Sequence, residues 1–529
     1  MKNMKRHHYL LSLLVILACG CTDEPFYEDP YGDGVSSVDL VGHEEIILGE
    51  KLEDPYSVKN ITKALANLYP TKGDYLDINP TNVYVRFLPK NDEQYKALVD
   101  AGLELIDHPV DYAIVQEGDY YHDPEIGEDS ITWQYTVVPS GTRFPEGIRY
   151  EVLDDCYIPD EDDTKGADGI DWSAVEKEAF RITGNEALYL PPTKGTKMHP
   201  EGRITIEDDR ANGGKPFGVA GVKVSCNTFV KFSSAYTDRD GYYSIPKSYS
   251  SKVRYRLVFK NKKGFAIGFN MILIPASMST MGRGTPEGVS LNVTRESEGK
   301  LFRRCVVNNA GYDYFERCGE NDMDIDAPPS GLRIWIFKPL KVSSAVMIHH
   351  GAILSDSLIQ GLLGEYGPLA QIFLPDITIG AKEAEDYASL YALTVHEFAH
   401  ASHFAKVGTD YWNHFIKYMV ESFIASGGVT YGNGKEEDAG YCEVGEMWAY
   451  FLESVMYQER YGGSAPSFGT SWWFSPQIFH YLFERGFTRS EIFAALTPEV
   501  HSKSSLHESL VKLYPDRKTT IDQVFSRYN

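Results

Sequence analysis

Two histidines and a glutamate occur in the order H-E-x-x-H within TVHEFAHASHFAKVG, residues 394–408. The stretch 390–406 has no proline or glycine and predicts a helix, so His396 and His400 would lie one turn apart on the same face. Two imidazoles at that spacing can share one metal ion, and Glu397, about 100° further round the helix, can reach a bound water. These residues therefore indicate hydrolysis at a Zn²⁺ site with Glu397 as general base.

A tetrahedral catalytic zinc needs a third protein ligand, and His403 is the nearest candidate in the sequence. On an unbroken helix His403 lies about 10.5 Å of rise beyond His396, which is too far for both to share one ion with bonds of about 2 Å. We therefore expect His403 to contact a ligand or the substrate, or to lie on the surface. The related motif with a glycine and then a third histidine is excluded, because His403 and Lys406 occupy those two positions.

A second predicted helix supplies a better third ligand. In GYCEVGEMWAYFLESVMYQERYGG, residues 440–463, helical phase separates a face of acids and tyrosines from an apolar face. The first face carries Glu443, Glu446, Tyr450, Glu453 and Tyr457. Its GEMWAYF stretch resembles the segment of gluzincin-type zinc metallopeptidases in which a glutamate completes the zinc site, and Glu446 is the matching residue. Glu443 is the alternative ligand if the helical register differs.

The same resemblance implies further site residues. Gluzincins often carry an aspartate four residues after the ligand glutamate, and because this chain has Tyr450 there, that contact to a zinc ligand is left open. A tyrosine or histidine stabilises the oxyanion in the family, which implies a role for Tyr457, His480 or Tyr481. Zincin folds also place an edge strand above the metal to pair with extended substrate, and residues 372–380 are predicted to be either that strand or an ordinary core strand.

The start of the chain, MKNMKRHHYLLSLLVILACGC, has a basic beginning and a short apolar run ahead of a cysteine. Residues 1–20 resemble a bacterial lipoprotein signal in which Cys21, or alternatively Cys19, becomes lipidated, although an ordinary secretion signal also fits. Residues 21–45 are predicted to form an acidic tether, which resembles that of Bacteroidetes lipoproteins displayed on the outer membrane. The expected location is therefore the cell envelope, with a lipid anchor in the membrane.

Charge and cysteine content narrow the range of partners and sites. The formal net charge is -24, and so acidic a surface repels phosphate backbones, which excludes nucleic acid as a partner. Besides Cys19 and Cys21 the chain has five cysteines; an oxidising compartment permits disulfides, and one between Cys305 and Cys318 would close a short loop. The absence of a C-x-x-C pair in the sequence argues against a thiolate zinc site.

The rest of the chain divides into three regions by pattern. Residues 46–200 alternate predicted strands and helices and suggest an α/β unit. Residues 201–275 predict short strands, and their G-V-x-V and T-D-x-D-G-Y-Y-S-I-P stretches resemble the carboxypeptidase regulatory-like (transthyretin-like) β-sandwich. Residues 276–529 would form a mainly helical, zincin-like catalytic domain. The predicted fold is thus multidomain α+β.

Together these features predict a cell-envelope zinc metallopeptidase that hydrolyses peptide or protein substrates. Two alternatives remain open. The 35 tyrosines, the tether and the sandwich also fit a glycan- or protein-binding surface lipoprotein that needs no metal. The zinc site would also serve the hydrolysis of a non-peptide amide, or would have lost its activity.

Overall fold

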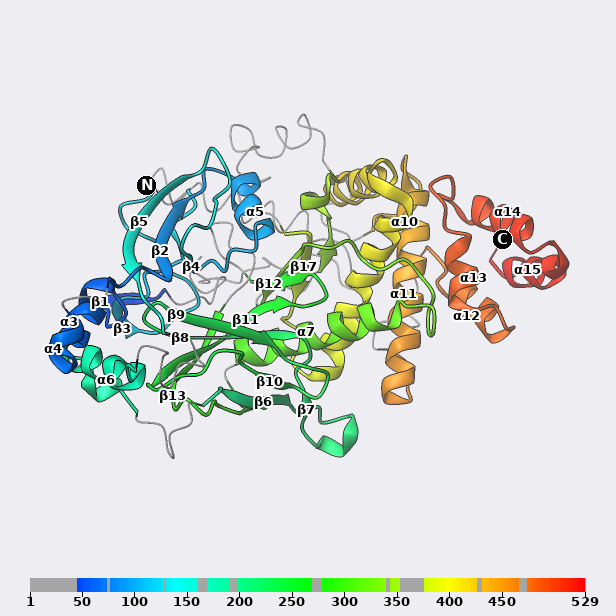
Figure 1. Cartoon of the computed structure of the whole chain (residues 1–529). Helices are drawn as coiled ribbons and strands as arrows, with labels where there is room; N and C mark the ends of the chain where they lie inside the picture. Colours follow the sequence, from blue (N-terminus) through cyan, green and yellow to red (C-terminus); the bar gives the residue numbers. More distant parts are fainter. Residues whose placement is uncertain are drawn as a thin grey trace, which may run out of the picture.

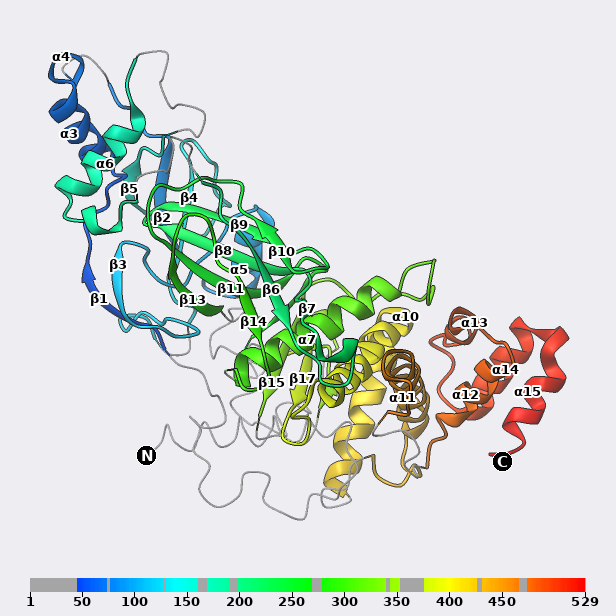
Figure 2. The ribbon, with the colours of Figure 1, turned by 90° about the horizontal axis from the view of Figure 1, so that it is seen from below.

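A computed structural model describes residues 45–73, 77–127, 130–159, 169–190, 198–268, 278–297, 299–338, 343–352, 375–425, 431–465 and 473–528. The fold is mixed α/β, with several sheets and a mainly helical C-terminal region. Figures 1 and 2 show an elongated molecule, with the N-terminal region at one end and the C-terminal helices at the other. The predicted signal, Cys19, Cys21 and nearly all of the tether lie outside the described residues. Within the described ranges, no helix is both long and apolar enough to cross a bilayer.

The N-terminal region forms two small sheets covered by helices. Its elements are β1 (Ile47–Lys51), α3 (Val58–Leu68), α4 (Pro70–Gly73), β2 (Asn82–Leu88), α5 (Asp92–Asp100), β3 (Tyr112–Gln116), β4 (Gln134–Pro139), β5 (Arg149–Cys156) and α6 (Trp172–Ile182). Strand β2 lies between β4 and β5, β1 pairs with β3, and all of these pairings are antiparallel. The region mixes strands and helices as predicted, and within the described residues the chain returns antiparallel to β2 and makes no parallel crossover in this sheet.

Two further sheets share one core in the middle of the molecule. One contains β6 (Glu201–Ile206), β7 (Phe217–Gly218), β10 (Tyr242–Ser244) and β14 (Leu291–Val293), and the other includes β8 (Val222–Thr228), β9 (Lys231–Tyr236), β11 (Val253–Asn261) and β13 (Met278–Gly284). In β11, Tyr255 and Leu257 face this core, whereas alternation turns Arg254 and Arg256 to the other face. Strands β13 and β14 lie beyond residue 275, so the strand-rich unit extends past its predicted boundary.

The larger sheet continues into the C-terminal region. It is completed by β12 (Phe265–Ile267), β15 (Leu332–Phe337), β16 (Ser344–Ala345) and β17 (Ile377–Gly380), in the order β16-β17-β15-β12-β11-β8-β9 with β13 beside β11. Strand β17 pairs in parallel with β15 and antiparallel with β16. It is thus an inner, buried strand, and the prediction of a substrate-pairing edge strand is wrong for residues 377–380; residues 372–374 lie outside the described chain.

Helices make up most of the C-terminal region. They are α7 (Gly299–Arg317), α10 (Tyr387–Ala425), α11 (Ala439–Tyr461), α12 (Gln477–Glu484), α13 (Arg489–Ala494), α14 (Lys503–Leu513) and α15 (Lys518–Phe525). Helix α10 packs along α11 and also against α7 (Figure 1). Both helices predicted around the candidate ligands are therefore present, and they are direct neighbours.

Gly408 turns the chain sharply within α10. Its φ of 80° and ψ of 179° define a conformation that essentially only glycine adopts. In a straight helix His400 and Trp412 would be about 18 Å apart, yet their rings lie 5.9 Å apart, and the ring of Phe415 is 5.5 Å from that of His400. The second half of α10 therefore folds back and covers the end of the H-E-x-x-H segment.

The expected disulfide between Cys305 and Cys318 is not formed. Cys305 lies within α7 and Cys318 follows directly after that helix, so the residues between them span about 20 Å of helical rise. A disulfide requires Cα atoms within about 7 Å. The five cysteines in the described part of the chain are all free and buried, so they serve as core side chains.

We expect Gly408→Ala to lower the free energy of unfolding by about 1–3 kcal/mol. A Cβ at this position meets nothing within 4 Å, so the cost comes from backbone strain and not from a clash. Denaturant or thermal unfolding measures the loss. Gly463→Ala is the matched control, because Gly463 also has nothing within 4 Å and has no positive φ. Equal effects of the two substitutions would contradict the role given to the turn.

Candidate metal centre

The three predicted ligands meet between α10 and α11. The Nε2 atoms of His396 and His400 are 3.1 Å apart. One carboxylate oxygen of Glu446 lies 3.4 Å from Nε2 of His396, and the other lies 3.4 Å from Nε2 of His400. All three side chains are at most 2% exposed. Among the residues that the structure describes, they form the only group of three or more His, Cys, Asp or Glu side chains able to hold a metal ion.

The spacing of these atoms fits a single zinc ion. Two ligand atoms of a tetrahedral site with bonds of about 2.0–2.1 Å are separated by about 3.3–3.4 Å. The two imidazole nitrogens are 3.1 Å apart, and each lies 3.4 Å from a different oxygen of Glu446. One ligand atom from each of the three residues lies within 4.8 Å of the other two. Imidazole and carboxylate groups both bind zinc, and three protein ligands leave a fourth position for water or substrate, as in catalytic sites. The donor set therefore suits a catalytic zinc ion better than a structural one.

The charges around the cluster also favour a cation. Glu397 and Glu446 are 0% exposed and Glu453 is 4% exposed. Burial opposes protonation of His396, but the carboxylates of Glu446 and Glu453 outweigh it and raise its pKa to about 10. Burial likewise acts to raise the pKa of Glu446, but His400 and His396 hold it below its ordinary value. Buried carboxylates need a compensating positive charge nearby, and a divalent cation would supply it.

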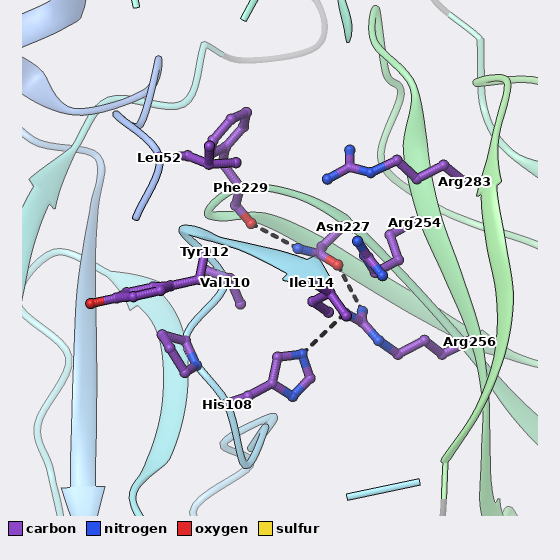
Figure 3. A pocket seen from close by; sticks show the side chains of 11 residues that line it. Leu52, His108, Val110, Tyr112, Ile114, Asn227, Phe229, Arg254, Arg256 and Arg283 are labelled. Carbon is purple, nitrogen blue, oxygen red and sulfur yellow. Dashed lines mark hydrogen bonds between the residues drawn. The ribbon is translucent and has the colours of Figure 1, made fainter. Parts of the chain in front are cut away.

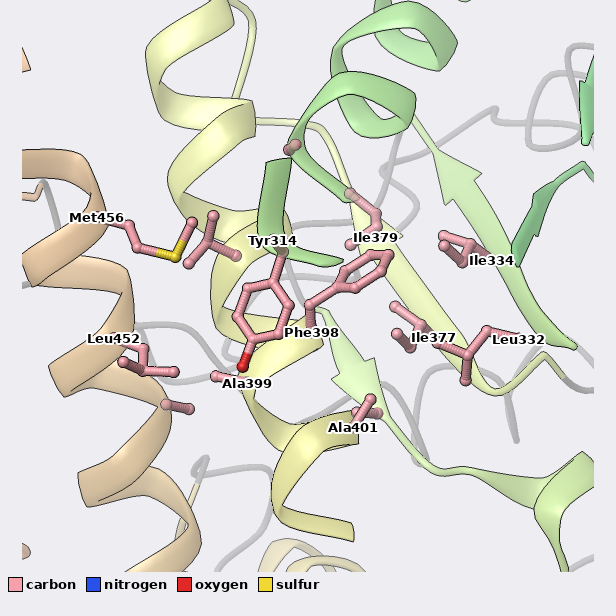
Figure 4. Close-up of a cluster of buried hydrophobic side chains, with 14 of the residues drawn as sticks. Tyr314, Leu332, Ile334, Ile377, Ile379, Phe398, Ala399, Ala401, Leu452 and Met456 are labelled. Carbon is pink, nitrogen blue, oxygen red and sulfur yellow. The ribbon is translucent and has the colours of Figure 1, made fainter. Parts of the chain in front are cut away.

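The apolar side of α10 fixes the rotation of this helix. Figure 4 shows Phe398 beside Tyr314 of α7 and on the side of α10 that faces Ile377 and Ile379 of β17, with Leu452 and Met456 of α11 on the opposite side. The ring of Phe398 packs edge-on against that of Phe265, 5.5 Å away. Gly311 permits this approach, because a Cβ there would lie 2.7 Å from the Phe398 ring. With Phe398 held in this core, the two histidines must face α11.

Glu453 orients the first histidine. Its carboxylate lies 2.9 Å from Nδ1 of His396 and accepts a hydrogen bond when that nitrogen is protonated. This tautomer leaves the Nε2 lone pair directed at the metal position. Glu453, seven residues after Glu446, thus makes the carboxylate contact to a histidine that Tyr450 cannot make. The sequence signal for this contact is the repeat of acidic residues at an interval of seven on one helix face.

Tyr450 lies next to the cluster but in a different role from the family aspartate. Its ring packs edge-on against that of His396, with 4.6 Å between centroids. Its hydroxyl is 3.3 Å from the hydroxyl of Tyr431. Tyr450 therefore limits the movement of the His396 ring by packing.

His403 is buried beside the cluster and is not part of the ligand group. Its ring lies 5.2 Å from that of Tyr411 and 5.9 Å from that of Trp412. Burial, with a smaller effect of His400, lowers its pKa to about 3, so this histidine is neutral. The expectation of a surface residue is wrong, and His403 packs among aromatic rings next to His400.

The other candidates lie away from the three ligands. Tyr457 accepts a hydrogen bond from Arg210 at 3.2 Å and is about 16 Å of helix rise beyond Glu446. His480 packs against Phe451, and Tyr481 packs against Tyr528 near the C-terminus. Within the described residues, none of these three belongs to the group formed by His396, His400 and Glu446. Glu443 accepts a hydrogen bond from the backbone of Lys503 and pairs with its side chain at 3.1 Å, so Glu446 and not Glu443 faces the histidines.

Comparison of the chain with protein-family models, with curated proteins and with solved structures found no match. The chemistry of the centre is therefore inferred from the geometry of its own residues. The decisive feature is that two distant segments supply His396, His400 and Glu446 to one buried point.

We expect Glu453→Gln to weaken zinc binding by about 10–100-fold, because His396 loses its charged hydrogen-bond acceptor. Titration of the metal-free protein with zinc in the presence of a competing chelator measures the change. Glu459→Gln is the matched control: it removes the same charge from the same helix, but Glu459 contacts Arg317 and Arg489 at the surface. Equal zinc affinities of the two variants would show that Glu453 does not orient His396.

Proposed function

We propose that the protein is a zinc-dependent hydrolase that cleaves peptide bonds, with His396, His400 and Glu446 as ligands and Glu397 as general base. The observation that carries this proposal is that His396, His400 and Glu446 each bring one ligand atom to a single buried point, within 4.8 Å of one another. The order H-E-x-x-H on α10 adds a carboxylate next to the first ligand, which a purely structural site does not need. We propose on this basis that the site is of the gluzincin type.

Each residue of the proposed site has a defined task. Glu397 takes a proton from the attacking water and delivers it to the leaving amine. Glu453 keeps His396 in the tautomer whose Nε2 is a ligand, and Tyr450 restricts the ring by packing. Zinc, when bound, would polarise the scissile carbonyl and lower the pKa of the water toward 7. All these side chains are buried.

The rest of the proposal concerns architecture and location. We propose that residues 201–275 belong to a carboxypeptidase regulatory-like sandwich that supports the catalytic helices and performs no chemistry itself. We also propose that residues 1–20 are a lipoprotein signal and that a lipid on Cys21, or on Cys19, anchors the protein in the bacterial outer membrane. The substrates would then be peptides or proteins in the cell envelope or outside the cell.

The structure weakens one argument for the alternative of a glycan-binding lipoprotein. The tyrosine content suggested aromatic platforms for sugars, but many tyrosines are core residues. Fully buried examples are Tyr56, Tyr243, Tyr249, Tyr255, Tyr314, Tyr391, Tyr418 and Tyr431. A metal-free binder also has no need for three ionisable side chains at one buried point. Peptide hydrolysis therefore explains the buried cluster of ionisable side chains better than glycan binding does.

Two substitutions separate the roles of base and ligand. We expect Glu397→Gln to keep one zinc per chain but to lose about 10²–10⁴-fold in hydrolysis of a peptide library, because the proton acceptor is removed. We expect Glu446→Gln to lose bound zinc and activity together. Elemental analysis of the purified protein and a mass-spectrometric cleavage assay provide the two measurements.

Glu443→Gln serves as the control for the ligand assignment. Glu443 lies one turn before Glu446 on α11 but contacts Lys503, so this variant should keep its zinc and its activity. A wild-type protein without stoichiometric zinc would refute the metal assignment. Stoichiometric zinc without cleavage of any peptide, but with release of amine from non-peptide amides, would replace peptides as the substrate class.

A further inference from the structure

Three arginines converge on a small cavity between the N-terminal region and the large sheet. Arg254 and Arg256 are two residues apart on β11 and therefore share one face, and Arg283 on β13 is directly opposite Arg254. Figure 3 shows their guanidinium groups on one side of the cavity and His108, Val110 and Tyr112 on the other. Like charges directly opposite each other destabilise a sheet. This arrangement therefore requires compensating negative charge.

The side chains around the cavity provide only part of that compensation. Arg254 pairs with Glu117. Arg256 is 4% exposed and donates to the side-chain oxygen of Asn227 at 2.8 Å and to Nε2 of His108 at 3.2 Å. In the described part of the chain, neither Arg256 nor Arg283 forms an ion pair. Two neutral acceptors therefore hold a buried guanidinium whose charge no carboxylate contacts.

His108 links Arg256 to a carboxylate at one remove. Its Nε2 accepts from Arg256, so its Nδ1 carries the proton and donates to Asp107 at 2.7 Å. Burial lowers the pKa of His108, so its ring is neutral. Burial, followed by the charge of Arg254, also lowers the pKa of Arg256 to about 10. In the described chain, the carboxylates that act on Arg256 are Glu117 and the indirectly connected Asp107, against three guanidinium groups.

The size of the cavity limits what can occupy it. Its volume of about 10 Å³ is close to what a single water-sized particle needs. Arg283 lines the cavity and is itself exposed, so the cavity is accessible from solvent on that side. A particle of this size that also carries negative charge is a monatomic anion. Phosphate or a carboxylate would require the surrounding side chains to shift.

We propose that this cavity is a binding site for a small inorganic anion of the size of chloride, held by Arg254, Arg256 and Arg283. The anion neutralises the charge that Glu117 leaves uncompensated. It also joins the two parts of the protein that form the cavity, since His108 and Tyr112 belong to the N-terminal region and the arginines belong to the large sheet. This site is independent of zinc and of the proposed hydrolysis.

Thermal unfolding of the full-length protein in sodium chloride and in sodium gluconate of equal ionic strength tests the proposal. Gluconate is too large for the cavity, so the wild type should unfold a few degrees higher in chloride, because a ligand that binds only the folded state stabilises it. Arg256→Gln and Arg283→Gln should each abolish this difference. Arg283 is exposed and has no ion pair within the described residues, so Arg283→Gln should fold. It therefore provides the test even if Arg256→Gln does not fold.

Arg203→Gln is the matched control, because Arg203 lies on β6 with an exposed side chain and should leave the chloride effect unchanged. Crystals grown in bromide should show an anomalous peak among the three guanidinium groups. Equal unfolding temperatures of the wild type in the two salts would overturn the proposal, as would a chloride effect that persists in Arg283→Gln. Arginine-dependent stabilisation by phosphate without any by chloride would contradict the assignment to a monatomic anion.

Discussion

The contact between α10 and α11 at His396, His400 and Glu446 is the constraint on which the rest of the C-terminal region depends. Ionisable groups away from solvent are tolerated only where their partners are placed accurately. Neighbouring features restrict this contact from several directions. Glu453 holds Nδ1 of His396, and Phe415, returned by the turn at Gly408, covers His400. Gly445 leaves room for that ring, because a Cβ there would lie 3.0 Å from Phe415.

The strands support the same contact from the other side of α10. Trp412 donates its indole N–H to the carbonyl of Ala345 on β16 at 2.9 Å, which fixes the returned half of α10 to the large sheet. Phe398 packs against Phe265 of β12, so a strand far earlier in the chain determines which face α10 turns to α11. The helices and the strand-rich unit share one core. A destabilised sheet would therefore disturb the ligand geometry without any change in a ligand.

Local periodicity explains which parts of the site could be predicted from the sequence. Residues three, four or seven apart on a helix share a face whatever the surrounding fold, so His396, His400, Glu446 and Glu453 were all identifiable as members of two polar faces. Long-range contacts decided the remainder. Tyr457 shares the helix face of Glu446, but its hydroxyl accepts a hydrogen bond from Arg210 and not from a group at the metal centre. Strand β17 is an inner strand because β16 pairs with it. Strand β16 has only two residues, which is too short for a sequence pattern to predict it.

Two buried charge imbalances of opposite sign occur in this chain, and its overall charge cannot correct either. A net charge of -24 does little for a buried guanidinium, because charges on the surface are screened beyond about 8 Å at physiological ionic strength. Compensation must therefore be local. Around His396 the excess is carboxylate, which favours a cation, and around Arg256 it is guanidinium, which favours an anion. A fixed carboxylate beside Arg256 would neutralise it permanently, whereas an exchangeable anion makes the packing of the N-terminal region on β11 respond to the ions in solution.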